Sequence, residues 1–243
     1  AKYVTELSHH KEIGSAFAKF IRDEFDFIEL TFSPEVVDLQ PFIWQGFDVD
    51  LHYTYRLSLE SLEAVLDNMD AARRRNLFSA EKQGVQVEGG DNFAQILRLR
   101  EMTFKRQGMA ASDGSAVIGF ESALRRAGRC QGFLARSKEG EPLGGVWIAW
   151  DDKRAYYLLG GFDRSAQSNN AVALAMWRAI QFTALDLKLP EFDFEGSMIP
   201  TIERFFRKFG GEITPNYTIR YRRPIGLGRR VARKFVRIVC GRD

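Results

Sequence analysis

Three stretches with strand character follow one another between residues 130 and 162, and only short turns separate them. They run from Cys130 to Ser137, from Leu143 to Asp151 and from Arg154 to Phe162. Turns this short join antiparallel strands as β-hairpins. The middle of the chain is therefore predicted to be an antiparallel meander.

The elements after the meander narrow the fold further. A polar loop at 163–169 leads into a predicted apolar helix from about Asn170 to Leu187, and residues 191–195 then alternate like a strand. A doubly wound sheet would alternate strands and helices throughout, whereas here a meander gives way to one strand–helix–strand crossover. We therefore expect an α+β fold with a mostly antiparallel central sheet flanked by helices.

Apolar periodicity predicts the remaining elements. Helices are expected at 9–24, 58–84, 91–107, 115–129 and 200–209, and strands at 25–32, 49–57, 85–88 and 217–221. Too few strands precede residue 58 to close a sheet of their own. We interpret residues 1–57 as the C-terminal remnant of a first lobe, 58–223 as one lobe and 224–243 as a C-terminal arm.

Composition fits a folded protein of a reducing compartment. Of the 243 residues 45% are hydrophobic and 13% aromatic, which is typical of a packed globule. Cys130 and Cys240 lie far apart, and neither has a second thiol or a histidine beside it, so neither a disulfide framework nor a zinc site is supported. Without a long apolar run or the apolar core of a signal peptide, the chain is expected to be cytoplasmic.

Positive charge is concentrated in the last 24 residues of the chain, which include the C-terminal arm. Between residues 220 and 243 one acid stands against nine basic residues: Arg220, Arg222, Arg223, Arg229, Arg230, Arg233, Lys234, Arg237 and Arg242. The stretch 226–240 is predicted to be an amphipathic helix with Val231, Phe235 and Ile238 on one stripe. Such an arm can bind the anionic inner face of a membrane, a lipid-linked precursor or the phosphates of tRNA. A solvated charged helix is the alternative.

Three motifs in the last two thirds of the chain carry a family resemblance. They are Tyr157–Gly161, Phe192–Ser197 and Phe205–Gly211. With the order of elements, they resemble the GNAT acyltransferase fold and, more narrowly, the C-terminal lobe of the Fem-type (FemAB-like) peptidoglycan-bridge aminoacyltransferases. Residues 41–57 resemble the closing strands of the first lobe of that family.

The resemblance implies an N-acyltransferase that moves an acyl or aminoacyl group onto an amine of a cell-envelope or polysaccharide precursor. No permanently bound cofactor is implied, and the donor substrate is acyl-CoA or aminoacyl-tRNA. Two differences from the family keep the donor open. The segment from Gln167 has Asn170 and Val172 where GNAT enzymes carry small residues, and Phe205-Phe206 stand where Fem-type proteins pair an aromatic residue with lysine. The alternative is a catalytically degenerate GNAT-like binding or scaffold module.

The polar loop is the expected site for the phosphates of the donor. Unpaired amides at the start of the following helix, a capping side chain and a nearby cation all favour an anion there. The candidate donor-binding residues are Arg164, Gln167, Ser168, Asn169 and Asn170.

Three side chains are candidates for proton transfer. Alternate residues of a strand share a face, so Asp193 and Glu195 are expected to point together, and either can accept the proton of an attacking amine. Tyr157 can orient a substrate or protonate a leaving group. The alternatives are a turn cap or an ion pair for Asp193, and packing for Tyr157.

Overall fold

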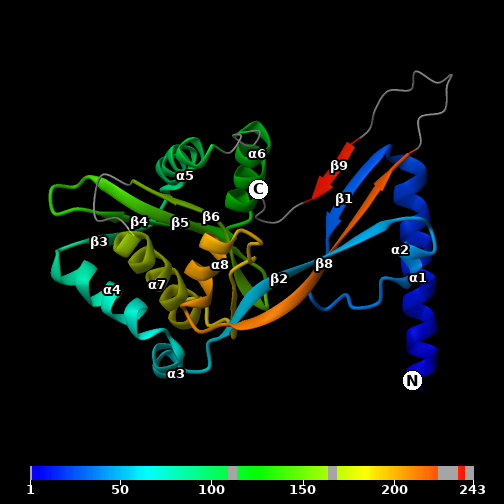
Figure 1. Ribbon diagram of the computed structural model, residues 1–243, viewed down its shortest axis with the longest axis horizontal. Coiled ribbons are helices and arrows are strands. Elements are labelled where there is room, and N and C mark those ends of the chain that lie inside the picture. Colours follow the sequence, from blue (N-terminus) through cyan, green and yellow to red (C-terminus); the bar gives the residue numbers. More distant parts are fainter. Residues whose placement is uncertain (1, 109–113, 164–168, 224–234, 239–243) are drawn as a thin grey trace. The chain divides into compact units, whose positions relative to one another are not determined.

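The computed structural model of the chain describes residues 2–108, 114–163, 169–223 and 235–238 (Figure 1). The chain forms two compact units. Residues 1–54 and 214–242 make up the first unit, and Tyr55–Ile213 make up the second. Strands β2 (Asp48–Ser58) and β8 (Glu212–Arg222) each contribute residues to both units.

A mostly antiparallel sheet forms the second unit. In addition to β2, its strands are β3 (Gln86–Gly90), β4 (Cys130–Arg136), β5 (Pro142–Trp150), β6 (Arg154–Phe162) and β7 (Glu191–Asp193). Their order is β3-β4-β5-β6-β7-β2. Neighbouring strands run antiparallel except β6 and β7, which are parallel. The predicted meander and the predicted α+β class are both confirmed.

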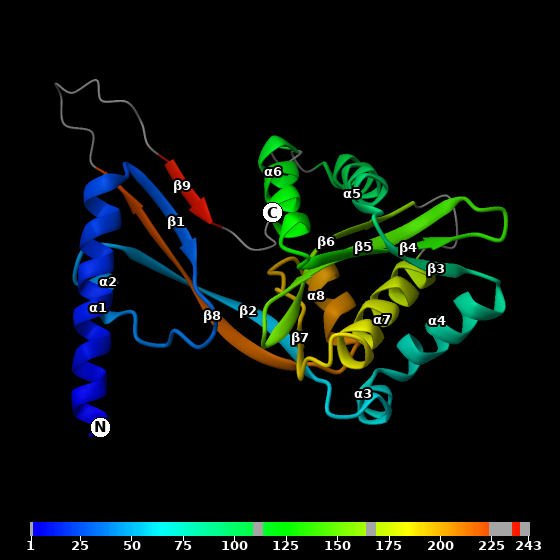
Figure 2. The same cartoon turned by 180° about the vertical axis from the view of Figure 1, so that it is seen from behind.

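Helices cover both faces of this sheet. They are α3 (Leu62–Asn68), α4 (Ala71–Lys82), α5 (Phe93–Gln107), α6 (Gly114–Arg126), α7 (Asn169–Leu185) and α8 (Pro200–Arg207). α5 and α6 lie on one face of β4–β6, and α7 and α4 lie on the other (Figures 1 and 2). Met176 and Ile180 of α7 are fully buried in the main core with Val146 and Ile148 of β5, as expected for an apolar helix packed on a sheet.

Two glycines let helices approach the central strands closely. A Cβ on Gly144 of β5 would lie 3.2 Å from the backbone nitrogen of Val172 in α7. On the other face, a Cβ on Gly161 of β6 would contact the backbone of Leu99 and Arg100 in α5. These glycines let α7 pack closely on β5 and α5 pack closely on β6, the strand that leads to the predicted donor loop.

The first unit combines a long helix with its own group of strands. Its elements are α1 (Tyr3–Glu24), β1 (Phe27–Thr31), α2 (Gln40–Ile43) and β9 (Phe235–Ile238), with the strand order β2-β8-β1-β9. β1 runs antiparallel to β8 and parallel to β9. A separate apolar cluster contains Ala18, Ile21, Ile28, Leu39, Phe42, Phe47 and Ile219.

The prediction of one helix from residue 58 to 84 is wrong, because an extended residue and a new N-cap interrupt the helix between α3 and α4. Met69 is extended, with φ −68° and ψ 140°. The side chain of Asp70 then accepts hydrogen bonds from the amides of Ala72 and Arg73 at 3.0 and 3.1 Å. The backbone N–H of Asp70 donates to the carbonyl oxygen of Lys208 at 3.1 Å. An N-cap and a long-range partner therefore outweigh the continuous apolar stripe.

The prediction of an amphipathic helix at 226–240 is also wrong over the part of it that the structure describes. Residues 235–238 form β9, in register with residues 27–30 of β1. Aromatic and β-branched residues favour a strand. Pairing with β1 then supplies the hydrogen-bond partners that the strand's backbone groups need. The rest of the arm lies outside the described residues.

No helix in the described ranges is both long and apolar enough to cross a membrane.

Candidate active site

The parallel strands β6 and β7 pair over three residues only. Tyr156 lies opposite Asp193 in the last pair, and β6 then continues to Phe162 with β5 as its neighbour. The register of β6 against β5 shifts at Trp147 and Ile148, which leaves Leu158 as an extra residue in β6. By this register, Tyr157 and Glu195 stand just beyond the last residue pair that β6 and β7 share.

Glu195 adopts a backbone conformation that is uncommon for a residue with a side chain. Its φ is +56°, and Gly196 follows with φ +68°. A left-handed conformation costs a non-glycine residue about 1–2 kcal/mol. Residues held this way are concentrated at functional sites. The predicted strand therefore ends at Asp193, and Glu195 lies in the turn that follows.

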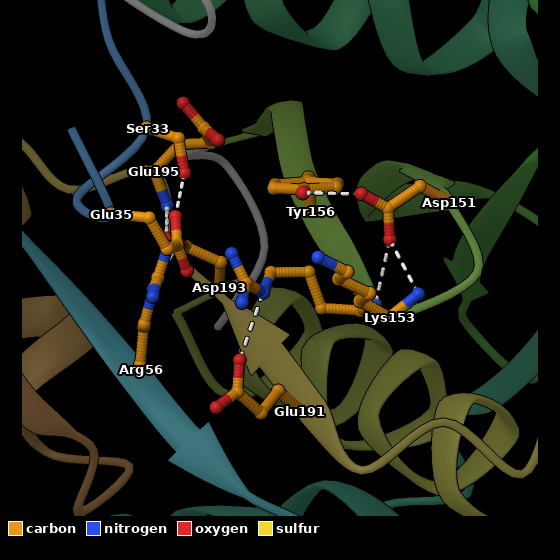
Figure 3. Close-up of polar contacts among 10 residues, drawn as sticks. Ser33, Glu35, Arg56, Asp151, Lys153, Tyr156, Glu191, Asp193 and Glu195 are labelled. Carbon is orange, nitrogen blue, oxygen red and sulfur yellow. Dashed lines mark hydrogen bonds and ion pairs between the residues drawn. The ribbon is translucent and has the colours of Figure 1, made fainter. Parts of the chain in front are cut away.

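Asp193 is buried and holds this turn in place. Its Oδ1 accepts a hydrogen bond from the backbone N–H of Glu195 at 2.8 Å. Its Oδ2 accepts one at 2.9 Å from Nε of Arg56, which lies directly opposite Asp193 in the β2–β7 register (Figure 3). Asp193 is 2% exposed. Both carboxylate oxygens therefore have partners within the protein.

Further polar side chains lie on the same face of these strands. Nε of Arg154, a buried residue, donates to Oε2 of Glu191 at 2.8 Å at the start of β7. The hydroxyl of Tyr156 donates to Oδ2 of Asp151 at 2.8 Å (Figure 3). Burial, and then the bond to Asp151, raises the pKa of Tyr156. This face of β6, β7 and β2 is therefore lined by paired charges and protonated phenol.

Tyr157 is half-buried on the opposite face. Its ring packs edge-on against Phe206 of α8, with 5.2 Å between the centroids. Burial raises the pKa of Tyr157 above its ordinary value, so the phenol keeps its proton at neutral pH. Tyr157 can therefore donate a hydrogen bond or a proton but cannot serve as a base.

The two phenylalanine motifs meet in the core beneath the site. Phe192 and Phe194 are fully buried, with ring centroids 5.1 Å apart. Phe194 also packs on Phe206 and Phe209 at 5.5 Å. Aromatic packing thus anchors the segment that ends in Glu195.

Most of the predicted donor-binding residues lie beyond what the structure describes. Arg164, Gln167 and Ser168 are outside the described residues, Asn169 is the first residue of α7, and Asn170 is half-buried in the first turn. The backbone just before the loop is fixed by α5. The carbonyl oxygen of Phe162 accepts a hydrogen bond from Nη2 of Arg106 at 2.7 Å.

Sequence reasoning did not identify Arg56 or Arg106. Arg56 closes a stretch of alternating polar residues in β2, which is a weak signal for one surface of a strand. Its partner Asp193 is 137 positions away, so only the strand register brings the two together. Arg106 lies on the polar side of a helix, where an arginine is unremarkable in sequence.

One family model matches the sequence over most of the second unit. The family model for the acetyltransferase (GNAT) domain matches residues 68–207, which is more than half of the chain. Comparison with curated proteins gives no match.

Several solved structures share the fold. A crystal structure of FemX is similar with a TM-score of 0.64 and 14% identity, over 88% of this chain and 75% of that chain. The C-terminal domain of a proposed lysylphosphatidylglycerol synthetase from Agrobacterium fabrum is similar with a TM-score of 0.58 and 13% identity, over 86% of this chain and 72% of that chain. A tandem GNAT protein from the clavulanic acid biosynthesis pathway is similar with a TM-score of 0.54 and 13% identity, over 85% of this chain and 67% of that chain.

At these identities the similarity to solved structures concerns the fold, and it confirms the predicted resemblance to GNAT and Fem-type proteins. The family model adds a match in sequence that spans α4 to α8. This chain therefore belongs to the family of proteins with a GNAT acetyltransferase domain.

Proposed function

We propose that this protein is an N-acyltransferase that moves an acyl or aminoacyl group onto an amine of a cell-envelope or polysaccharide precursor. The family supports acyl transfer. The observation that carries the proposal is the conformation of Glu195, which is held beyond the last β6–β7 pair in a left-handed turn by a buried carboxylate. We propose Glu195, rather than Asp193, as the proton acceptor, because Asp193 is buried and engaged by Arg56 and the Glu195 amide, whereas Glu195 is only half-buried.

The chemistry assigns a separate role to each side chain. The amine nitrogen attacks the acyl carbonyl carbon and forms the new C–N bond, while the bond between that carbon and the sulfur or oxygen of the donor breaks. Glu195 takes the proton that the amine loses. Tyr157 is protonated at neutral pH, and its ring packs on Phe206 on the other face of the strands. It donates a hydrogen bond or a proton to the departing group where that group enters between β6 and β7, beyond their last pair.

The donor in this proposal is acyl-CoA or aminoacyl-tRNA, both of which carry phosphates. We assign their binding to the loop before α7 and to the first residues of that helix, namely Arg164, Gln167, Ser168, Asn169 and Asn170. Backbone amides at a helix start are suited to phosphate. We further propose that the basic arm contributes through tRNA, a lipid-linked precursor or an anionic membrane surface. Unchanged binding of RNA and liposomes after deletion of 224–243 would rule out this role of the arm.

Transfer assays with the whole chain test the proposal. Labelled acetyl-CoA and charged tRNA are each offered with a panel of amines: amino sugars, lysine-containing peptides and lipid-linked precursors. We expect Glu195→Gln to lower kcat by about a hundredfold or more. Glu191→Gln, four residues earlier at the start of β7, should keep the activity. Absence of transfer, together with no calorimetric binding of either donor, would favour the binding or scaffold module.

A further inference from the structure

Arg56 has no place in the chemistry proposed above, yet it is connected to Glu195 through one side chain. Its Nε donates to Oδ2 of Asp193, and Oδ1 of the same carboxylate accepts the backbone N–H of Glu195. The three residues therefore form a continuous chain of hydrogen bonds from β2, across β7, to the turn (Figure 3).

Burial makes this connection stiff. The side chain of Asp193 is 3% exposed and that of Arg56 is 15% exposed, so water competes little for either group. A hydrogen bond between ionised partners in such surroundings is stronger than a neutral one. Removal of one partner from a buried pair leaves the other charge without compensation. Loss of Arg56 removes one of the charged partners of Asp193, so the orientation of its carboxylate is expected to become less fixed.

The backbone around Asp193 confines the effect to the turn. Phe192 and Phe194 on either side are fully buried, and the amide of Phe194 donates to the carbonyl oxygen of Tyr55 at 3.0 Å. The strand itself is therefore fixed without Arg56. Glu195 lies beyond it in a strained conformation, and the bond to Oδ1 of Asp193 opposes relaxation of that strain.

We propose that Arg56 is a positioning residue, which fixes the backbone of Glu195 through Asp193 and thereby orients the Glu195 carboxylate. The inference rests on the proposed role of Glu195 as the proton acceptor. It adds a residue from β2, 139 positions before Glu195 in the sequence (195 − 56), to a site otherwise drawn from β6, the turn after β7 and the start of α7. Arg56 itself need not touch the substrate.

Amide hydrogen exchange measured by NMR tests the structural half of the inference on the whole chain. Arg56→Met should speed exchange of the Glu195 amide by about tenfold, whereas the Phe194 amide should change little. Arg56→Lys should restore part of the protection because it returns a cation to Asp193. Glu191→Gln is the matched control, since it removes an ion pair from the same strand and leaves the bond between Asp193 and Glu195 in place.

Kinetics of the same variants test the functional half. A positioning role predicts that Arg56→Met lowers kcat about tenfold while KM for the donor stays within about twofold, and that Arg56→Lys recovers part of kcat. Cooperative unfolding of each variant checks that it is folded, and Asp193→Asn is the isosteric second variant if Arg56→Met does not fold.

The outcomes separate the two proposals. Unchanged exchange at Glu195 in Arg56→Met would overturn the positioning role whether or not the protein is active. Faster exchange with an unaltered kcat would overturn it as well. Lack of transfer by the wild-type chain would instead overturn the proposed function, and faster exchange at Glu195 would then still support the structural link.

Discussion

Arg73 is a buried cation that contributes to stability at the scale of a single residue. Its guanidinium lies over the rings of Phe205 and Phe209, at 4.3 and 4.8 Å from their centroids. Nη2 donates at 3.1 Å to the carbonyl oxygen of Phe205, near the C-terminal end of α8, where helical carbonyls lack partners within the helix. Burial lowers the pKa of Arg73 to about 10, so it remains charged at neutral pH.

Replacement of Arg73 should therefore destabilise the protein. We expect Arg73→Ala to lower the free energy of unfolding by about 2–3 kcal/mol, through the lost hydrogen bond and the lost contact with the rings. Arg73→Met should be milder because it keeps the apolar stem. Urea denaturation measures both changes. Equal losses in the two variants would show that the guanidinium accounts for the whole effect.

The raised pKa of Tyr55 predicts that the folded protein loses stability at alkaline pH. Burial, and then the 2.6 Å hydrogen bond to Oε1 of Glu203, raises the pKa of Tyr55 from 10.0 to about 12. In the unfolded chain the phenol loses its proton at lower pH than in the folded chain. Its contribution to stability is therefore fully present below pH 10 and is lost as the pH rises towards about 12.

The comparison that isolates this residue is with Tyr55→Phe. Free energies of unfolding measured from pH 9 to 12 should fall less steeply with pH for the variant than for the wild type. The difference between the two slopes should correspond to about one titrating group. Tyr156 and Tyr157 remain in both proteins and contribute equally. Parallel curves would show that Tyr55 is not the group responsible.

Close packing of α5 on β6 governs stability at the scale of elements. A side chain on Gly161 would overlap the backbone of α5, which can yield only if the whole helix moves. We expect Gly161→Ala to destabilise by about 1–3 kcal/mol. Gly119, in the exposed part of α6, has nothing within 4 Å of an added Cβ. There the same change should stabilise by about 0.5–1 kcal/mol. Thermal unfolding of both variants checks the opposite signs.

β9 gives the C-terminal arm a structural role in addition to any partner. It pairs with β1 over residues 27–30, and its removal would leave backbone groups of β1 without their partners. Unpaired edges promote association between chains. Deletion of 224–243 should therefore increase concentration-dependent aggregation in light scattering. Truncation after Ile238, which keeps β9, should not, and similar aggregation in the two proteins would contradict this role.

Elements that follow from local pattern could be predicted from the sequence, whereas those set by distant partners could not. The meander and α7 were predicted because hairpin turns and apolar periodicity are local signals. The break at Asp70 depends on the carbonyl of Lys208, and β9 depends on β1. The same reason separates Glu195, which a local motif indicates, from Arg56, whose importance arises only through the register of β2 and β7.

At the scale of the whole molecule, the two units differ in whether they are built from one continuous segment of the sequence. The second unit is continuous from Tyr55 to Ile213, and two of the apolar clusters lie within it. The first unit is discontinuous, because residues 1–54 depend on the later strand β8 for pairing with β1 and on Ile219 for their own cluster. Expectations drawn from residues 1–57 alone could not include this dependence.

This asymmetry predicts how fragments of the chain behave. A fragment of residues 55–213 contains its complete core and should unfold cooperatively on heating, with a heat capacity change in proportion to its length, about 12–15 cal/mol/K per residue. Residues 1–54 alone should lack a cooperative transition, since an isolated helix and a few strands without their partner strand are marginal in water. Calorimetry and circular dichroism of the two fragments measure both properties. A folded 1–54 fragment would mean that β8 and Ile219 are dispensable to the first unit, and a 55–213 fragment without a transition would mean that its core needs the residues on both sides of it.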